Sequence, residues 1–494
     1  MKVDAVIYVD DGCTEDNLMF RGAFVPDEMW KRLSSVRALN EIVFAIPHGY
    51  AGKLPEGAKS FTRNERDDTS FWKRLFSETG AEHVVRIPAD SPFLDASIVN
   101  EMIDLHLKYL SEYTYSENLP QGFSCEIMGR ELVESIPQSL EKMLPLGEVV
   151  RSNINQFDVE LFYKEPDIRD TRISFRLSNP RDRRIMENIA EMTGDIPPYA
   201  KIRDILNSNP GVLFVGPSYV EIEITGRCEL DCVFCHRTKL KNEHGDMDTA
   251  LFRKICADLG AFSLPYSICL GGSGEPMMHD RFYEIMEIAL SDRLCANLIV
   301  ETNGIYAGAN FKNFLLDRND GRIKVIANIN GLDGETYRLL HGKDYFDVVH
   351  QNICSLRDAL PDTGSLYVQI MKINETEPFL DRYYDFWEKA KIPIVLQKQN
   401  TFCGLIEDRR YSDLSPLDRV PCWHLQRDLT VLADGAVAFC RQDADGVHAR
   451  GNVKETSLRE LWNDSLNAFL QDYKGDYRRN PDCASCDEWY TFNL

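Results

Sequence analysis

Residues 219–235 read YVEIEITGRCELDCVFC, an apolar, β-branched run that leads directly into three closely spaced cysteines. The run 219–225 has the composition of a buried parallel strand. Cys228, Cys232 and Cys235 follow on the loop at its carboxyl end, where parallel α/β folds place their chemistry. Three thiolates at this spacing can hold three irons of a cubane cluster and leave the fourth iron without a protein ligand.

The spacing C-x3-C-x2-C, with Phe234 before the last cysteine, resembles the signature of the radical S-adenosylmethionine (SAM) superfamily. The resemblance implies a catalytic [4Fe–4S] cluster whose open iron binds SAM. One electron then cleaves SAM into methionine and a 5′-deoxyadenosyl radical. Two other interpretations of the three cysteines stay open at this point: a zinc site with His236 as fourth ligand, and a chance grouping.

Residues 213–405 alternate strand-like and helix-like segments. The expected strands after 219–225 are YSICLGG (266–272), NLIVETNG (297–304), IKVIANING (323–331), LYVQIMKIN (366–374) and IPIVLQKQ (392–399). Amphipathic stretches between them, such as 247–260 and 281–292, are typical of helices. Repeated βα units of this number predict a TIM-like barrel that is only partly closed.

Two turns at the ends of these strands carry further family resemblance. Gly272, Gly274 and Glu275 belong to a GGSGEP turn that resembles the glycine-rich element whose backbone holds the SAM methionyl group. Thr302 and Asn303 belong to a TNG turn that recurs in the family. The resemblance implies that both turns help to seat SAM.

The fourth and fifth expected strands end in amides. Asn328 and Asn330 stand where family members with this pattern usually read serine and aspartate. Asn328 is therefore expected to reach a ribose hydroxyl, whereas position 330 has lost a carboxylate. Gln369 and Asn374 are further pocket candidates, and Asn374 is expected to contact SAM. For each of these side chains a hydrogen-bonded strand-end turn is the alternative interpretation.

A second group of cysteines lies in residues 415–494. Its four thiolates are enough to ligate a [4Fe–4S] cluster completely: Cys422, Cys440, Cys483 and Cys486. With the Gly435-x4-Cys440 step and the GNV and LWN segments, this tail resembles the SPASM extension of radical SAM proteins. It has fewer cysteines than a full extension, so one auxiliary cluster is expected, with structural zinc as the alternative. Cys403 is a candidate extra ligand or redox thiol, with a buried structural cysteine as the alternative.

Residues 1–205 predict a separate, parallel Rossmann-like α/β domain, with strands over 3–10, 41–47 and 83–90. RIPADSPFLD (86–95) resembles cytidylyltransferases of the acylneuraminate and spore-coat polysaccharide type, with Asp90 at the position of a Mg²⁺ ligand. The loop after the first strand is acidic where a nucleoside triphosphate needs cations. We therefore expect a degenerate nucleotidyltransferase-like domain that binds a substrate, a nucleotide-sugar or a partner, or only stabilises the barrel.

The order of cytidylyltransferase-like domain, radical SAM barrel and short SPASM tail resembles the spirochaete "spiro-SPASM" proteins. The reaction is expected from the SPASM resemblance instead: SPASM relatives most often act on peptides or proteins, so this resemblance implies hydrogen abstraction from such a substrate, with a reducing donor such as flavodoxin or ferredoxin. A carbohydrate or cell-envelope precursor is the second substrate class. A non-catalytic scaffold with two zinc sites is the rival interpretation.

The composition limits the remaining function classes. A chain of 494 residues with 44% hydrophobic and 27% charged residues is typical of globular proteins. The net charge of −22 argues against a nucleic-acid partner, and therefore against tRNA modification. We find no apolar run long enough to span a membrane, and residues 1–12 resemble a first strand more than a signal peptide. The fourteen cysteines are then expected in the cytoplasm, where clustered thiols bind metal.

Overall fold

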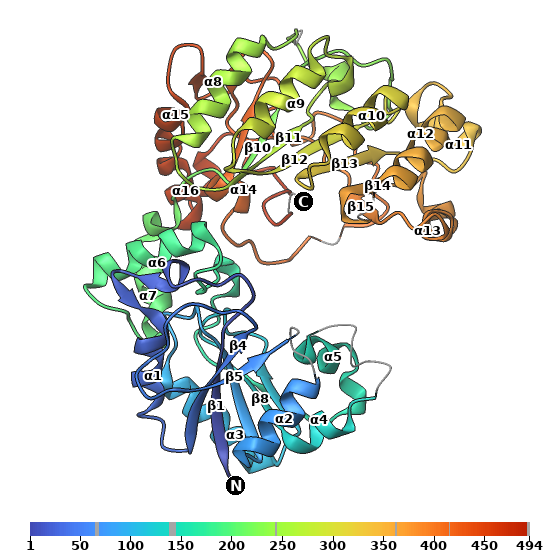
Figure 1. Cartoon of the computed structure of the whole chain (residues 1–494). Coiled ribbons are helices and arrows are strands. Elements are labelled where there is room, and N and C mark those ends of the chain that lie inside the picture. The colour runs from blue at the N-terminus through green and yellow to red at the C-terminus, as the bar shows by residue number, and fades with distance from the viewer. Residues whose placement is uncertain (65–68, 138–144, 243–244, 361–362, 414, 492–494) are drawn as a thin grey trace. The chain divides into compact units, whose positions relative to one another are not determined.

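The computed structural model describes residues 1–64, 69–137, 145–242, 245–360, 363–413 and 415–491. The chain divides into two compact units, Met1–Val215 and Gly216–Leu494, and each has its own sheet (Figure 1). The division falls in the Pro- and Gly-containing stretch 207–218, whose composition predicts a linker. Among the described residues, no helix combines the length and the apolar character that a membrane span needs.

The first unit is built on a seven-stranded sheet with the order β5-β4-β1-β6-β8-β7-β9. Its centre is β1 (Val3–Tyr8), which is buried along its whole length and runs parallel to β4 (Glu41–Pro47) and β6 (His83–Pro88). β5 (Lys59–Arg63) extends this parallel part. Because the carboxyl ends of parallel neighbours meet at one edge, residues that follow β1 and β6 are brought together.

The other end of this sheet is not parallel, in contrast to the prediction. β8 (Glu126–Gly129) pairs antiparallel with both β6 and β7 (Tyr113–Ser116), and β9 (Val159–Phe162) runs parallel to β7. No helix separates β7 from β8 in the chain order. A parallel pair needs a crossover of about a dozen residues or more, so strands joined this directly pair antiparallel.

The polar segment 180–207 forms two helices. α6 (Pro180–Thr193) ends at Gly194, whose φ of 79° lies in the left-handed region. α7 (Ile202–Ser208) begins only after a stretch with two consecutive prolines, which cannot continue a helix. The other helices of this unit are α1 (Val25–Leu33), α2 (Thr69–Thr79), α3 (Ala96–Tyr109), α4 (Arg130–Ser135) and α5 (Leu146–Ser152).

The second unit contains a nine-stranded sheet with the order β15-β14-β13-β12-β11-β10-β16-β17-β18. The six strands expected from the sequence all form and run parallel: β10 (Tyr219–Ile222), β11 (Tyr266–Leu270), β12 (Cys295–Thr302), β13 (Ile323–Asn328), β14 (Leu366–Lys372) and β15 (Ile394–Lys398). This is the partly closed (β/α) barrel predicted for the chain.

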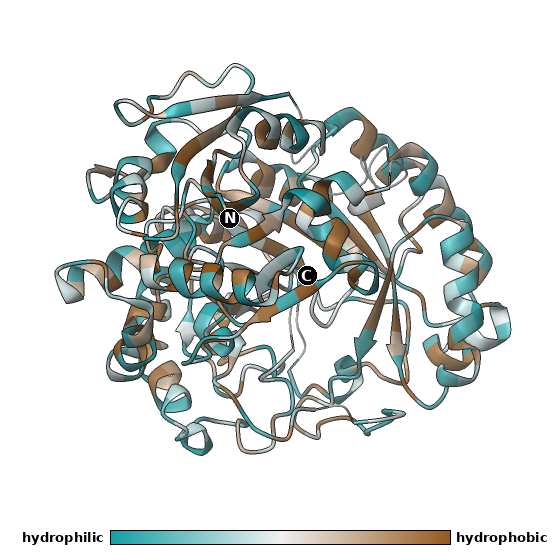
Figure 2. Cartoon of the chain, turned by 90° about the horizontal axis from the view of Figure 1, so that it is seen from below, coloured by the Kyte–Doolittle hydropathy of each residue, from teal (hydrophilic) through white to brown (hydrophobic). Residues whose placement is uncertain are grey.

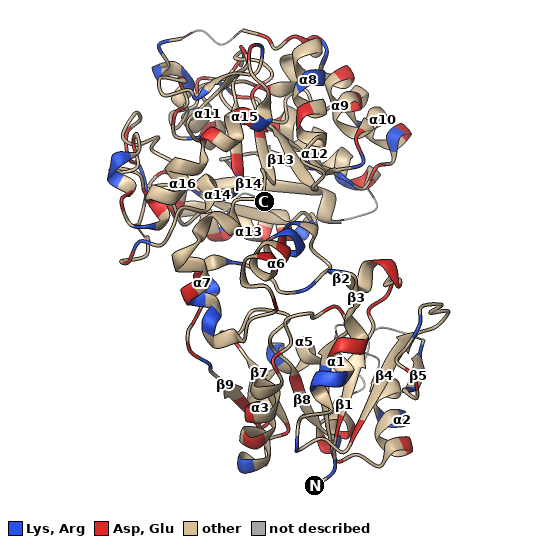
Figure 3. Ribbon diagram, turned by 90° about the vertical axis from the view of Figure 1, so that its left-hand side faces the viewer, with Lys and Arg blue, Asp and Glu red and all other residues tan. Residues whose placement is uncertain are grey.

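The helices that connect these strands follow the outer side of the curved sheet (Figure 1). They are α8 (Thr249–Gly260), α9 (Phe282–Ser291), α10 (Ala309–Arg318), α11 (Gly334–His341), α12 (Phe346–Ala359) and α13 (Leu380–Lys389). Brown, apolar residues mark the strands in Figure 2, and teal residues mark much of the helices. Charged residues lie on helices such as α8 and α10, whereas β13 and β14 are largely uncharged (Figure 3).

The C-terminal segment is joined to the barrel by backbone pairing. β16 (Asp428–Val431) runs parallel to β10, and the short strands β17 (Ala436–Val437) and β18 (Gly451–Asn452) continue the sheet antiparallel. The tail also contains α14 (Trp423–Arg427), α15 (Leu458–Asp464) and α16 (Leu466–Tyr473). The second cysteine group therefore belongs to the same compact unit as the first.

The inner side of the barrel is layered. Buried Tyr219, Cys269, Ile299 and Ile326 form one apolar cluster. Tyr367 on β14 packs against this cluster. Polar side chains follow two residues after Tyr219, Ile299, Ile326 and Tyr367: Glu221 on β10, Glu301 on β12, Asn328 on β13 and Gln369 on β14. Because side chains on a strand alternate between its two faces, this polar layer faces the same interior as the apolar cluster.

Candidate functional site

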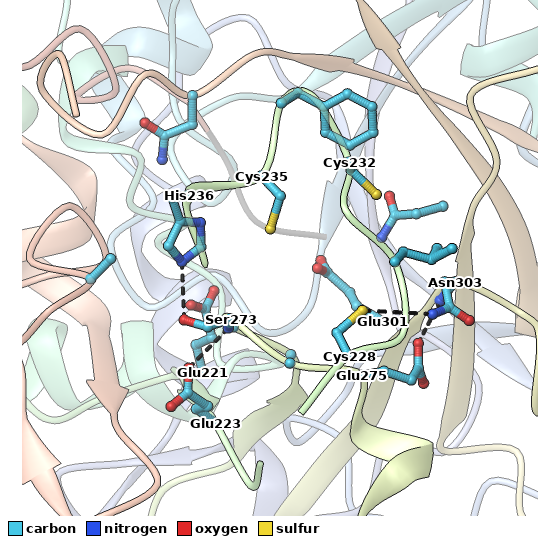
Figure 4. A pocket seen from close by; sticks show the side chains of 18 of the residues that line it. Glu221, Glu223, Cys228, Cys232, Cys235, His236, Ser273, Glu275, Glu301 and Asn303 are labelled. Atoms are coloured by element: carbon cyan, nitrogen blue, oxygen red, sulfur yellow. Dashed lines mark hydrogen bonds between the residues drawn. The ribbon is translucent and has the colours of Figure 1, made fainter. Parts of the chain in front are cut away.

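The loop after β10 carries Cys228, Cys232 and Cys235, and all three line one cavity of about 200 Å³ (Figure 4). The same cavity is lined by nearly every other residue predicted to seat SAM: Phe234, Gly272, Gly274, Glu275, Thr302, Asn303 and Asn328. Gln369 also lines it. The folded chain thus brings together the two turns after β11 and β12 and side chains of β13 and β14 around the cysteine loop.

Asn374 is the predicted residue that the structure does not bring to this cavity. It follows β14, its side chain is exposed, and its backbone N–H donates to the carbonyl of Arg409 at 2.8 Å. The strand-end turn at this position is therefore hydrogen-bonded, which was the alternative interpretation. The Asn330 side chain is likewise hydrogen-bonded within the protein, because its Oδ1 accepts the backbone N–H of Met371 at 2.7 Å.

Two glycines shape the turn beside the cysteine loop. Gly272 has a φ of 97°, which favours glycine. Gly274 lies so close to the cysteine loop that a Cβ placed on it would come within 2.0 Å of the Thr225 carbonyl oxygen. The next residue, Glu275, donates its N–H to the Arg227 carbonyl at 2.8 Å. The glycine turn and the cysteine loop are thus held against each other by backbone contact.

Replacement of Gly274 by alanine is expected to lower the free energy of unfolding by about 1–3 kcal/mol, because the new methyl group must displace backbone. It should also weaken SAM binding by moving the turn away from the cysteines. Gly321→Ala is the matched control, since nothing lies within 4 Å of its added Cβ. Chemical denaturation and equilibrium dialysis of SAM measure the two effects, and equal stability of the two variants would contradict the assigned close approach.

Glu275 joins two of the predicted SAM elements. Its carboxylate accepts the backbone N–H groups of Asn303 at 2.7 Å and Met277 at 3.1 Å, and the Thr302 hydroxyl at 2.9 Å. Burial raises the pKa of Glu275 to about 7 in spite of these donors. The side chain therefore fixes the TNG turn to the glycine turn, a positioning role that sequence resemblance alone does not reveal.

The three thiols fit an iron–sulfur cluster by their chemistry. Burial raises the pKa of Cys228 to about 11 and also raises the pKa of Cys232 and Cys235. Protein groups alone therefore do not stabilise three thiolates here. Iron ions would supply the positive charge that holds them deprotonated.

His341, at the end of α11, is a neighbour of this loop that sequence reasoning missed. Its Nδ1 lies 3.1 Å from Cys232 Sγ, and its Nε2 accepts the backbone N–H of Asn330 at 3.2 Å. Burial lowers the pKa of His341 to about 3, so the ring is neutral. With Nε2 accepting, the proton resides on Nδ1, and His341 donates a hydrogen bond to the Cys232 sulfur.

His236, the candidate fourth ligand of a zinc site, faces the glycine turn. Its Nε2 lies 3.1 Å from the Ser273 hydroxyl (Figure 4), and its ring packs on Phe402 with centroids 4.0 Å apart. Within the described ranges, no three His, Cys, Asp or Glu side chains converge closely enough to hold a single metal ion.

The second cysteine group lines another, smaller cavity of the same unit. Four cysteines reach it from separate parts of the tail: Cys422 before α14, Cys440 after β17, and Cys483 and Cys486 near the C-terminus. All fourteen cysteines of the chain are free thiols. Burial raises the pKa of Cys440 and Cys422, so these thiols also fit a site where metal supplies positive charge.

A buried ion pair organises the backbone of this second group. Asp472 on α16 accepts the N–H of Cys422 at 2.5 Å and pairs with Arg419 at 3.2 Å. Arg419 in turn donates to the carbonyls of Cys483 at 3.2 Å and Cys486 at 3.5 Å. One Asp–Arg pair therefore connects three of the four proposed ligands.

Cys403 lies beside this second group. Its thiol is 3.5 Å from the Asp482 carbonyl and 3.8 Å from Gln442 Oε1, and its interaction with Cys486 raises its pKa. The preceding residue, Phe402, lines the first cavity. The loop after β15 thus connects the surroundings of the two cysteine groups.

In the first unit, the expected Mg²⁺ position is filled by an arginine. Asp10 follows β1 and Asp90 follows β6, so the two carboxylates meet at one sheet edge. Arg176 Nε donates to Asp90 Oδ1 at 2.7 Å, and its Nη2 pairs with Asp10. Asp90 also accepts the N–H of Ser178 at 3.2 Å. These residues do not fit a divalent cation, because a guanidinium already neutralises both carboxylates.

Arg176→Met is expected to create a divalent-cation site that the natural chain lacks. Titration with Mn²⁺, followed by its EPR signal, should show weaker binding by the unchanged protein than by the variant. The double variant Arg176→Met/Asp90→Asn should lose the gained site, because one carboxylate remains. Tight Mn²⁺ binding by the natural chain that Asp90→Asn abolishes would show that Arg176 does not replace the metal.

Comparison with known proteins identifies both cysteine regions. Residues 222–381 match the model of the radical SAM superfamily, and residues 422–487 match the iron–sulfur cluster-binding SPASM domain. The chain thus contains a radical SAM domain followed by a SPASM domain. The resemblance seen in the sequence is thereby confirmed. A radical SAM domain implies a [4Fe–4S] cluster and SAM as cofactors, and a SPASM domain implies additional iron–sulfur ligation.

Individual relatives cover different parts of this chain. An uncharacterized protein of Treponema pallidum is 27% identical over 364 residues, which are 70% of this chain and 98% of that protein. A cytidylyltransferase structure from Leptospira borgpetersenii covers 43% of this chain and 96% of its own, with 18% identity and a TM-score of 0.37. Streptococcus suis SuiB, bound to its precursor peptide SuiA, covers 73% and 83%, with 14% identity and a TM-score of 0.44.

Proposed function

We propose that the chain is a radical SAM enzyme in which Cys228, Cys232 and Cys235 hold the catalytic cluster. When bound, this cluster supplies the electron that cleaves SAM to methionine and a 5′-deoxyadenosyl radical, which abstracts hydrogen from the substrate. The observation that carries the proposal is the convergence of the cysteine loop with the GGSGEP and TNG turns around one cavity.

The residues of the chain have separate tasks in this site. Three thiolates leave one corner of a cubane without a protein ligand, which is where SAM binds in the proposal. Gly272 and Gly274 let backbone approach the cofactor, and Glu275 fixes that turn to Thr302 and Asn303. His341 donates to the Cys232 sulfur and so favours its deprotonated, metal-bound state.

The tail cysteines are proposed to hold one auxiliary [4Fe–4S] cluster: Cys422, Cys440, Cys483 and Cys486. With all four corners ligated by protein, such a cluster passes electrons or shapes the pocket and does not bind SAM. The electron donor that reduces the catalytic cluster is proposed to be a flavodoxin or ferredoxin. Peptides or proteins are the first substrate class, because SPASM relatives most often act on them, and carbohydrate or cell-envelope precursors are the second.

The proposed function is tested by reductive SAM cleavage. Protein reconstituted without oxygen and reduced with dithionite should form 5′-deoxyadenosine from SAM, with about eight irons per chain for two clusters. Iron and zinc analysis distinguishes iron–sulfur clusters from zinc sites at the two cysteine groups. Stoichiometric zinc with no nucleoside would support the rival scaffold, and absence of nucleoside from fully iron-loaded protein would contradict the enzyme assignment.

A further inference from the structure

The polar layer inside the barrel lies on the same cavity as the cysteine loop. Glu221, Glu301, Asn328 and Gln369 all line it, and Asn328 is also one of the residues predicted to seat SAM. Arg441, the residue after Cys440, reaches the cavity from the tail. A substrate that meets a radical formed at the cysteine loop must therefore contact this layer or lie beside it.

Most polar groups of the layer have partners within the protein. Glu221 pairs with Arg441 at 3.2 Å, and Gln369 Nε2 donates to Asn328 Oδ1 at 2.5 Å. Glu301 is the exception: in the part of the chain that the structure describes, no donor forms a hydrogen bond or ion pair with its carboxylate. Figure 4 shows this side chain pointing into the cavity.

The other glutamates of the cavity are already bonded. Glu223 accepts the Ser273 N–H at 2.9 Å, and Glu275 accepts three donors of its own turns. Burial raises the pKa of Glu301, and Arg441 only partly opposes this effect. Glu301 is half-buried, and a carboxylate in this position that lacks a protein partner would be stabilised by a ligand that brings positive charge.

The charge of the lining indicates the same kind of ligand. Four glutamates and one arginine line the cavity, and that arginine already pairs with Glu221. A carboxylate forms its strongest hydrogen bonds with charged donors, and a cavity lined by one sign of charge attracts the opposite sign. An amide or hydroxyl group would satisfy Glu301 geometrically and leave the excess negative charge unbalanced.

We propose that Glu301 binds a protonated amino group of the substrate, so that the enzyme acts on an amine-bearing molecule. This inference rests on the proposed function above and specifies its substrate class. An amino sugar and a lysine side chain of a peptide both carry such an amino group. The experiment distinguishes them by using one probe of each kind.

The test uses the reconstituted full-length enzyme with SAM bound and its catalytic cluster reduced. D-glucosamine and a lysine-containing tripeptide are the amine probes, and their N-acetylated forms are the neutral controls. Binding is followed by the change in the cluster EPR signal. At least one amine is expected to bind about tenfold more tightly than its acetylated form, a difference of about 1.4 kcal/mol.

Glu301→Gln should lose this preference, Glu301→Asp should retain part of it, and exposed Glu335→Gln should leave it unchanged. The affinity for SAM should stay the same in all three variants. Equal binding of amine and acetylated probes, or no amine binding by enzyme that still forms 5′-deoxyadenosine, would overturn the inference and leave the proposed function intact. Loss of SAM binding in Glu301→Gln would also overturn it, because the carboxylate would then serve the cofactor.

Discussion

The variant Cys228→Ala/Cys232→Ala/Cys235→Ala is expected to form no 5′-deoxyadenosine above background, whereas the natural chain forms it under reducing conditions. The three thiols are the proposed ligands of the cluster that binds SAM, and they line the cavity shared with the glycine turn. Removal of these ligands should release about four of about eight irons per chain. Nucleoside analysis and iron analysis of the same sample measure both effects.

The remaining iron makes this prediction specific. The tail cysteines line a different cavity from the loop after β10, so the iron that they hold is expected to persist in the triple variant. Cys354→Ala is the matched control, because Cys354 is a half-buried thiol on α12 that belongs to neither group. Retention of SAM cleavage by the triple variant, or its loss in the Cys354 control, would exclude the assigned ligands.

Replacement of Asp472 by alanine should have the second largest effect, the loss of the auxiliary metal site. The substitution removes the acceptor of the Cys422 N–H and the partner of Arg419. The Asp472 side chain is fully buried, and that of Arg419 is 16% exposed. Breaking such a pair leaves a buried charge uncompensated, which costs about 3–5 kcal/mol.

The measured outcome is the metal content together with the free energy of unfolding. Asp472→Ala is expected to lose iron from the tail and to keep SAM cleavage at the first cluster. Asp472→Asn keeps a carbonyl acceptor and should lose less iron than Asp472→Ala. Asp320→Ala breaks an Asp–Arg pair with Arg322 elsewhere in the unit and serves as control. Full iron content in Asp472→Ala would show that the pair does not organise the ligand backbone.

Much of the architecture of the second unit could be predicted from its sequence. Each barrel strand is a short β-branched run, and the cysteine, GGSGEP and TNG motifs follow three of them directly. Parallel strands place their carboxyl ends at one edge, so motifs far apart in the chain meet without any further information. The three cysteines and both turns were found in this way.

Other parts depend on pairing that no local pattern encodes. β8 pairs antiparallel with β6, and β16 pairs with β10 of the barrel. Both pairings join segments whose local sequence does not specify the partner strand. The division of 180–207 into α6 and α7 was readable in principle, because Gly194 and two consecutive prolines interrupt that stretch.

Several site residues carry weak local signals. Glu301 directly precedes the TNG turn and Arg441 directly follows Cys440, so adjacency to a motif could have marked both. His341 lies 109 residues after Cys232, and Asp472 lies 50 residues after Cys422, on a helix between Cys440 and Cys483. No spacing rule links either residue to the cysteine that it contacts. Asn374 shows the opposite case, where a strand-end amide is exposed and does not line the cavity.

The central claim is that the cluster on Cys228, Cys232 and Cys235 has one iron free to bind SAM. Electron–nuclear double resonance can test it on a variant with the four tail cysteines changed to alanine, so that only this cluster remains. With SAM labelled by ¹⁵N at the amino group and ¹⁷O at the carboxylate, the reduced cluster should show magnetic coupling to both labels. A fully reduced cluster with saturating SAM and no coupling to either label would contradict the claim.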